Sequence, residues 1–395
     1  MIIKRFSLLL IPLLGWSVTF QEFSGRVYEN AIEKLENDAA IQSTDYSKNL
    51  ALSAEPVNIG LSSRKIRGDD SVDDGYEYGF MTEWTFKMPQ LSNAQSAEWE
   101  IIRKNLSHQG NILRRMVDID LKHEWLKYET ASARVAIYSE KAQLSDKAYE
   151  AGKKQHIAGR MSKMELMRLE SESLKAKEDL NKAQMEAEHV QHVLREKSMS
   201  HDPVVIDDLK FEYIRDNEIV HMAINQSPAL ETIQMKITQI NAQINTARES
   251  RFESFSIGVG ATQEPTQKSI DFSVSIPITL PNRYENTIAA LMSERSALEH
   301  QKKNMQTKIR LGVEALSEHL SERENMIRKS DATHKQYESL FSMAQKAFEG
   351  GIITQFEYLA TKREYYDARL RSIDLRDEYI DEMYELESRL GVIVR

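Results

Sequence analysis

Four short stretches of the chain alternate apolar and polar residues. The clearest alternation runs from Ile270 to Leu280, where every second residue is apolar. A period of two places all the apolar side chains on one face of a strand, so each stretch predicts a strand with one apolar face. The four predicted strands are residues 57–64, 76–88, 254–262 and 269–280.

Long stretches after the strands repeat apolar residues in alternating steps of three and four. One series starts at Tyr128 and another at Leu166. This spacing keeps one stripe of a helix facing a partner helix, as in a coiled coil. No proline lies between Asn93 and Asp202, and none follows Pro281, so nothing breaks these helices. A helix of about 60 residues is roughly 90 Å long, which is too long for one globular core.

The order of predicted elements occurs twice, at an offset of 192 residues. Pro89 and Pro281 each follow a strand, and Gly159 and Gly351 each open the motif G-x-x-S/T-x-x-E. One offset at separate sites indicates a tandem duplication, and a repeat of this length is not a solenoid unit. The predicted domains are a signal peptide (1–20), a first repeat (21–196, with helices 31–51, 94–150 and 162–195), a connector (197–222) and a second repeat (223–395, with helices 223–253, 284–348 and 354–390).

The N-terminal residues have the pattern of a secretory signal peptide. Lys4 and Arg5 precede a short apolar run that ends in small residues. This run is too short to span a bilayer as a stable helix, and an interfacial anchor is the alternative. We therefore expect the mature chain to lie outside the cytoplasm, where only its strands could enter a membrane.

Composition excludes several kinds of function. The formal net charge is −9, with no basic tract, which argues against nucleic acid as a partner. The chain has no cysteine, which excludes disulfides, thiolate metal sites, cysteine nucleophiles and a lipid anchor on cysteine. His189 and His192 could bind a metal and Met161, Met164 and Met167 could bind Cu(I), but a solvated face and helix packing explain them better. We expect no enzyme activity, no cofactor and no metal site, because no catalytic motif occurs.

The alternation of about ten residues, with apolar and polar faces, is typical of transmembrane β-barrel strands. Strands of soluble β-sandwiches have the same pattern, but the long helices and the signal peptide favour a membrane. Four strands cannot close a barrel, and open edges are not tolerated in lipid. Three copies would supply twelve strands, enough for a closed barrel with a lumen. The residues predicted to face lipid are Phe80, Trp84, Phe86, Phe272, Val274 and Ile276.

In this order the elements resemble the TolC-like outer-membrane efflux proteins. The resemblance rests on the duplicated layout and on four motifs. These are the helix start at residues 223–230, the strand end at 276–281, the turn at 347–359 and the end at 386–391. It implies a mainly α fold with a small β part for each chain. It also implies a homotrimer, in which a 12-stranded outer-membrane β-barrel continues into a periplasmic α-helical barrel.

The resemblance also implies a function. The chain would lie in the outer membrane of a Gram-negative bacterium, with a large periplasmic portion. It would be a passive conduit in a tripartite efflux system, carrying small molecules or metal ions from a periplasmic adaptor and an inner-membrane pump. The alternatives are the channel of a type I protein secretion system and, in a different class, a periplasmic adaptor or coiled-coil scaffold.

Carried over residue by residue, the resemblance places Glu357, and Glu165 in the first repeat, at a pore constriction in the periplasmic tip. A ring of three carboxylates would attract cations and raise some carboxylate pKa values. Phe348 and Ile353 occupy the positions where the family has a tyrosine and an arginine that close the pore, so that latch is not expected here. Tyr149 and Arg160 in the first repeat could substitute for it. Gly152 predicts seven extra residues in the first turn. The turn residues expected to dock the adaptor or pump are Gly159, Arg160, Ser162, Gly351, Ile353 and Thr354.

Overall fold

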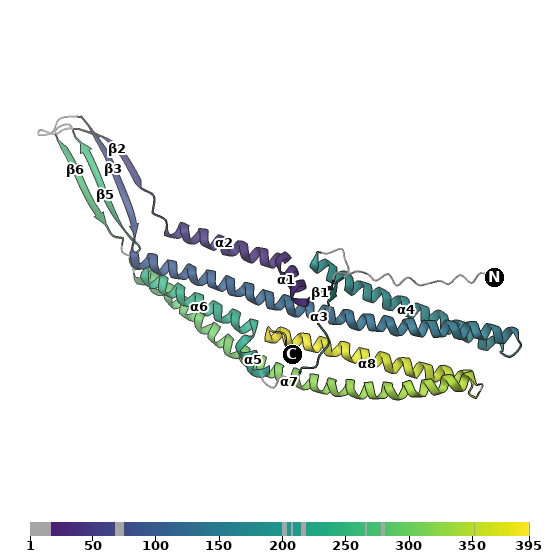
Figure 1. Ribbon diagram of the computed structural model, residues 1–395. Coiled ribbons are helices and arrows are strands. Elements are labelled where there is room, and N and C mark those ends of the chain that lie inside the picture. The colour runs from purple at the N-terminus through teal and green to yellow at the C-terminus, as the bar shows by residue number, and fades with distance from the viewer. Residues whose placement is uncertain are drawn as a thin grey trace. The chain divides into compact units, whose positions relative to one another are not determined.

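The structure, a computed structural model, describes residues 17–67, 75–199, 204–206, 208–214, 219–264, 267–277, 281–350 and 352–394. The chain folds into two compact units, and the elements of both are labelled in Figure 1. The predicted signal peptide lies mostly outside the described residues. Unit 1 contains Met1–Lys34, Ile112–Pro228 and Lys308–Arg395, and unit 2 contains Leu35–Asn111 and Ala229–Thr307.

Unit 2 contains one four-stranded antiparallel sheet, in the order β2-β3-β5-β6 (Figure 1). Strands β2 and β3 come from the first repeat, and β5 and β6 come from the second. The last strand is shorter than predicted, because it ends at Ser275 and Ile276 follows it as irregular chain. Residues 278–280 of that prediction lie outside the described part. The strands are β2 (Asn58–Ile66), β3 (Gly75–Lys87), β5 (Ser254–Gln263) and β6 (Lys268–Ser275).

The register of the sheet gathers the apolar side chains on one face. Trp84 lies opposite Ile257, and Ile257 lies opposite Val274, so one apolar row crosses three strands. The other face is polar: Arg64 on β2 forms an ion pair with Glu77 on β3, with 2.5 Å between Nη2 and Oε2. The period-two pattern therefore produces a sheet with one apolar and one polar face.

Four helices of unit 2 pack in the order α2–α3–α6–α7. Lys48 on α2 donates to Glu100 on α3 at 2.6 Å, and Thr246 on α6 donates to Glu98 on α3 at 2.7 Å. Lys302 on α7 donates to Gln234 on α6, also at 2.7 Å. Helices α2 and α7 therefore lie at the two ends of this order. The helices are α2 (Ile32–Leu52), α6 (Pro228–Glu249) and the first parts of α3 (Pro89–Ile157) and α7 (Pro281–Glu349).

The long helices of unit 1 pack in the order α4–α3–α8–α7. Ion pairs join each neighbouring pair: Lys141 of α3 with Asp179 of α4 at 3.2 Å, Lys122 of α3 with Glu387 of α8 at 2.7 Å, and Arg376 of α8 with Asp331 of α7 at 3.0 Å. The remaining elements of this unit are α1 (Phe20–Asn30), α4 (Lys163–Ser198), α5 (Ile219–Gln226), α8 (Gln355–Leu390) and a parallel pair of short strands, β1 (Ser17–Val18) and β4 (Val205–Ile206).

The helix bounds repeat at the predicted offset. Helices α3 and α7 both have 69 residues, and α4 and α8 both have 36. The expectation of seven extra residues in the first turn is wrong. Gly152 instead allows α3 and α4 to pack closely, because a Cβ atom at this position would clash with the side chain of Leu169 on α4. None of the described helices has a stretch both long and apolar enough to cross a membrane.

The sequence patterns missed two features of the first helices: a further helix, α1, precedes the predicted helix 31–51, and the predicted helix 223–253 is broken. In the first repeat, Ala31 adopts an extended conformation, with φ −66° and ψ 130°, between α1 and α2. In the second repeat, α5 ends at Gln226 and α6 begins at Pro228. Proline is favoured at a first helical position because it needs no intrahelical partner for a backbone N–H there.

The buried ion pair between Lys122 and Glu387 provides a test of packing in unit 1. Lys122 Nζ and the backbone N–H of Val394, 2.8 Å away, both donate to Glu387, whose pKa burial raises above its ordinary value. Removing one charge of a buried pair costs roughly 3–5 kcal/mol, because the other charge stays buried alone. We expect Lys122→Met to lower the free energy of unfolding by about that much, measured by chemical denaturation in detergent.

The double variant Lys122→Met/Glu387→Gln should recover a large part of this loss, because it leaves no buried charge unpaired. The exposed pair of Lys182 with Glu178 on α4 is the control, and Lys182→Met should change stability by less than about 1 kcal/mol. Equal losses in the single and double variants would contradict the argument.

Candidate functional site

The turn between α3 and α4 is held by a Schellman motif. The backbone N–H of Arg160 donates to the carbonyl of Gln155 at 2.9 Å, and that of Gly159 donates to the carbonyl of His156 at 3.0 Å. Gly159 has φ +70°, a left-handed conformation that favours glycine. These bonds satisfy carbonyl groups at the end of α3 and reverse the chain.

Helix α4 then begins with a capping box. Ser162 Oγ accepts from the backbone N–H of Glu165 at 3.2 Å, and Glu165 Oε2 accepts from the backbone N–H of Ser162 at 2.9 Å. This arrangement satisfies two backbone donors that the first helical turn leaves unpaired. A carboxylate also interacts favourably with the positive end of the helix dipole.

The turn between α7 and α8 repeats this design. The backbone N–H of Ile352 donates to the carbonyl of Ala347 at 2.8 Å, the counterpart of the bond from Arg160 to Gln155. Thr354 Oγ1 accepts from the N–H of Glu357 at 3.3 Å, and Glu357 accepts from the N–H of Thr354 at 2.7 Å. Gly351, the counterpart of Gly159, lies outside the described residues.

The capping boxes explain the motif G-x-x-S/T-x-x-E by local geometry. Two hydrogen bonds from Ser162 lower the pKa of Glu165: the one from its hydroxyl has the larger effect, and the one from its backbone N–H has the smaller. The backbone N–H of Thr354, followed by its hydroxyl, lowers the pKa of Glu357. Within one chain these shifts oppose the rise expected from a ring of carboxylates. Sequence reasoning missed this role, although S/T-x-x-E before a helix is itself the signal for a capping box.

Apolar side chains stand exposed at both turns. Ile352 is 81% exposed and Phe356 74% exposed around the second turn, and Ile157 and Met164 flank the first turn in the same way. Arg160 is also exposed, whereas Ile353 is partly buried. Each turn therefore presents apolar groups that are free to contact a partner.

An aromatic cluster supports the second turn from behind. The ring of Phe348 stacks on Tyr358 with 4.7 Å between centroids, and Phe341 stacks on Tyr365 at 4.9 Å. Tyr366 in the same cluster is fully buried, and Ile353 packs against it. Phe348 and Ile353, which stand at the family's latch positions without its hydroxyl or charge, therefore pack within their own chain. Of the suggested substitutes, Tyr149 lies under Lys153, whose Nζ is 4.2 Å from the ring centroid.

One lysine is buried next to this cluster. Lys362 on α8 is 1% exposed, and its Nζ donates to Ser145 Oγ on α3 at 2.6 Å. Burial lowers the pKa of Lys362 to about 8, although the negative charge of Glu172 on α4 acts to raise it. The α3–α8 contact thus contains an ammonium group that is poorly compensated.

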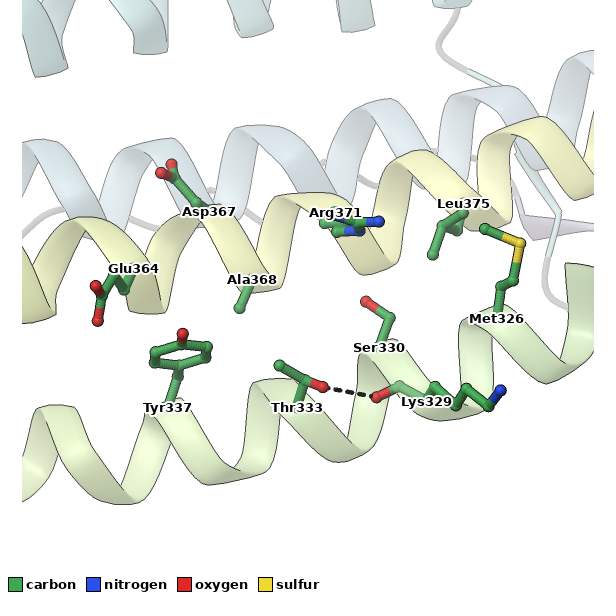
Figure 2. A pocket seen from close by; sticks show the side chains of 10 residues that line it. All are labelled: Met326, Lys329, Ser330, Thr333, Tyr337, Glu364, Asp367, Ala368, Arg371 and Leu375. Atoms are coloured by element: carbon green, nitrogen blue, oxygen red, sulfur yellow. Dashed lines mark hydrogen bonds between the residues drawn. The ribbon is translucent and has the colours of Figure 1, made fainter.

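An open groove of about 500 Å³ lies between α7 and α8 (Figure 2). Met326, Tyr337 and Leu375 give it apolar walls, and Lys329, Glu364, Asp367 and Arg371 lie along its sides. Figure 2 shows Thr333 donating to the carbonyl of Lys329, so that hydroxyl is bound within its own helix. No cluster of three histidine or acidic side chains suited to a metal ion occurs among the described residues.

The residues predicted to face lipid are all exposed in the single chain. Their exposed fractions run from 38% for Trp84 to 79% for Phe272. All but Ile276 lie within strands on the apolar face of the sheet. The structure therefore brings five of the six together on one surface of unit 2: Phe80, Trp84, Phe86, Phe272 and Val274. The sixth, Ile276, lies just beyond β6.

Comparison with known proteins gives a family match and several similar folds. Residues 219–392 match the family described as outer membrane efflux protein. No curated protein matches the chain. Similar solved structures include the outer membrane channel CmeC of Campylobacter jejuni, with a TM-score of 0.73 and 11% identity over 94% of this chain and 85% of that one. They also include the outer membrane protein VceC of Vibrio cholerae, with a TM-score of 0.72 and 11% identity over 94% of this chain and 96% of that one.

The family match confirms the predicted resemblance to the TolC-like outer-membrane efflux proteins over residues 219–392. A family of efflux proteins also agrees with the prediction that the chain is not an enzyme. At 11% identity, the similar structures establish the fold alone. They share a mainly helical chain with a small sheet.

Lys362 makes the stability of unit 1 depend on pH. Its folded pKa, about 8, lies below the ordinary lysine value of 10.5, so the unfolded chain holds the proton more tightly between these values. Stability therefore rises as pH increases through this window, and the cost of the buried charge is complete below pH 8. We expect Lys362→Met to stabilise the protein by up to roughly 3 kcal/mol at pH 7 and to lose this advantage by about pH 11.

Denaturation midpoints of both proteins, measured in detergent across this range, check the prediction. Ser145→Ala controls for the lost hydrogen bond, because it removes the acceptor and keeps the ammonium group. Parallel pH curves for the wild type and Lys362→Met would show that Lys362 is not desolvated as described.

Proposed function

We propose, from the match of residues 219–392 to the outer membrane efflux protein family, that the chain is one subunit of a passive efflux channel. Three copies would combine their sheets into a 12-stranded barrel in the outer membrane of a Gram-negative bacterium. Their helices would form a tube in the periplasm. The subunit would perform no chemistry, and the energy for transport would come from an inner-membrane pump.

The apolar face of the sheet is the observation that carries this proposal. Phe272 and Val274 on β6 are 79% and 73% exposed, and Leu61 on β2 is 82% exposed. Such large apolar patches mark surfaces that contact a partner or a membrane. The opposite face carries Arg64, Glu77 and small polar residues, which suit a water-filled lumen.

The two turns of unit 1 would form the periplasmic tip. Their exposed apolar groups, Ile352 and Phe356 among them, support a contact with the adaptor or pump through Gly159, Arg160, Ser162, Gly351, Ile353 and Thr354. Glu165 and Glu357 would line the constriction, each held in place by its capping box. A fixed carboxylate in a narrow pore attracts cations.

We propose a periplasmic adaptor and an inner-membrane pump as partners, and small molecules or metal ions as the exported solutes. A type I protein secretion channel remains the alternative, since a passive tube serves both systems.

Charge on the apolar face of the sheet tests the membrane assignment. Phe272→Asp would place a carboxylate in lipid, at a cost somewhat below the roughly 2–4 kcal/mol that a lysine or arginine has near the middle of the bilayer. We expect this variant to lose recovery as a detergent-extracted trimer from the outer membrane. Ser273→Asp, one residue away on the polar face, is the matched control and should assemble normally. A wild-type chain recovered as a soluble periplasmic monomer would refute the channel.

Glu357→Gln tests the proposed constriction. Glutamine can complete a capping box in place of glutamate, so this change removes the charge and keeps the turn. We expect weaker block of conductance by divalent cations in planar bilayers. Glu178→Gln, which removes an exposed carboxylate from the middle of α4, should leave the block unchanged. Identical block in the wild type and both variants would show that Glu357 does not line the pore.

A further inference from the structure

The fold of unit 1 begins before the end of the predicted signal peptide, which covers residues 1–20. Ser17 and Val18 form β1, and this strand pairs in parallel with β4 of the connector. Helix α1 starts at Phe20. The last four residues of the predicted signal peptide therefore take part in the fold, and a cut after residue 20 would remove them.

Thr19 is the N-cap of α1. Its backbone is extended, with φ −67° and ψ 150°, and its Oγ1 accepts from the backbone N–H of Glu22 at 3.3 Å. Its carbonyl accepts from the backbone N–H of Phe23 at 3.0 Å. An N-cap satisfies backbone donors that the first helical turn leaves unpaired. A chain that began after Thr19 would lose both bonds, so α1 would start without its cap.

Phe20 joins the start of α1 to the connector. Its backbone N–H donates to Asp208 Oδ1 at 2.7 Å, and its side chain packs against a buried apolar cluster. Because this cluster combines side chains from α1, α3, α4 and the connector, the start of α1 is fixed to the core of unit 1. The buried members of the cluster are Phe23, Val27, Leu121, Trp125, Leu194, Val204 and Ile206.

The sequence offers two places where a signal peptide could be removed. Signal peptidase cuts after two small residues that are separated by one other residue, as in A-x-A. At the end of the apolar run, Gly15 and Ser17 form one such pair, and Ser17 and Thr19 form another. The first pair predicts a mature chain that begins at Val18, and the second predicts one that begins at Phe20.

The structure distinguishes these two sites by charge and by the cap. A cut before Phe20 would create an ammonium group on the first residue of α1. The N-terminus of a helix carries a partial positive charge, so a cation there is unfavourable, and Asp208 would offset only part of this cost. A cut before Val18 places the ammonium group ahead of the cap. It leaves the bonds of Thr19 and the bond to Asp208 intact.

We propose that signal peptidase cuts the bond between Ser17 and Val18, so that the mature chain begins at Val18. The step is a hydrolysis, in which water adds a hydroxyl group to the carbonyl carbon of Ser17 and a proton to the amine of Val18. Of the residues that the structure describes, the cut removes Ser17 alone. Val18 stays paired with Ile206 of β4. This inference corrects the predicted boundary and does not depend on the proposed channel.

The mass and the first residues of the mature protein test the site. The full chain is expressed with its signal peptide, purified from the cell envelope in detergent, and examined by intact mass measurement and N-terminal sequencing. We expect a mass that matches residues 18–395 and a sequence that starts V-T-F-Q-E. A chain that starts at Phe20 or at any other residue would overturn the proposal, and so would an uncut chain.

Gly15→Gln and Thr19→Gln are matched variants, because each removes a small residue from one candidate pair only. For Gly15→Gln we expect about a tenfold loss of mature product and a build-up of uncut chain, since the cut needs a small residue there. Thr19→Gln should still be cut before Val18, although its denaturation midpoint should fall because α1 loses its cap. Normal cutting of Gly15→Gln together with blocked cutting of Thr19→Gln would place the site before Phe20 and refute the proposal.

Discussion

Four strands with one apolar face and two unpaired edges impose the constraint on which the rest of this structure depends. The sheet buries little of its own surface: every residue of β6 is exposed, and so are the large side chains along β2 and β3. Water solvates such a face poorly, and free edges invite further pairing. The described part of one chain offers no cover for either, which supports the proposal that lipid and further copies of the chain supply it.

The helices face the same constraint in a different form. The long helices of unit 1 pack through buried clusters such as that of Phe341 and Tyr366, and through ion pairs such as Lys141 with Asp179. In unit 2, α2 still exposes large apolar side chains, because Leu35, Tyr46 and Leu50 are 57%, 74% and 76% exposed.

The turns of unit 1 show how one motif can serve both folding and the proposed function. A glycine ends one helix, and a hydroxyl and a carboxylate start the next, so G-x-x-S/T-x-x-E is complete as a folding signal. The same carboxylates then stand at fixed positions on an exposed turn. Their low pKa keeps them charged, which suits a role in attracting cations.

The sequence by itself determined the features that depend on local periodicity. Alternation marked the four strands, and the 192-residue offset marked helices of equal length. Only the tertiary structure decided which groups meet. It placed a further helix, α1, before the predicted helix 31–51, used Gly152 for close packing against Leu169, and buried Lys362 beside Ser145. Periodicity is carried by neighbours in the chain, whereas these contacts join residues that are distant in sequence and depend on how whole helices pack.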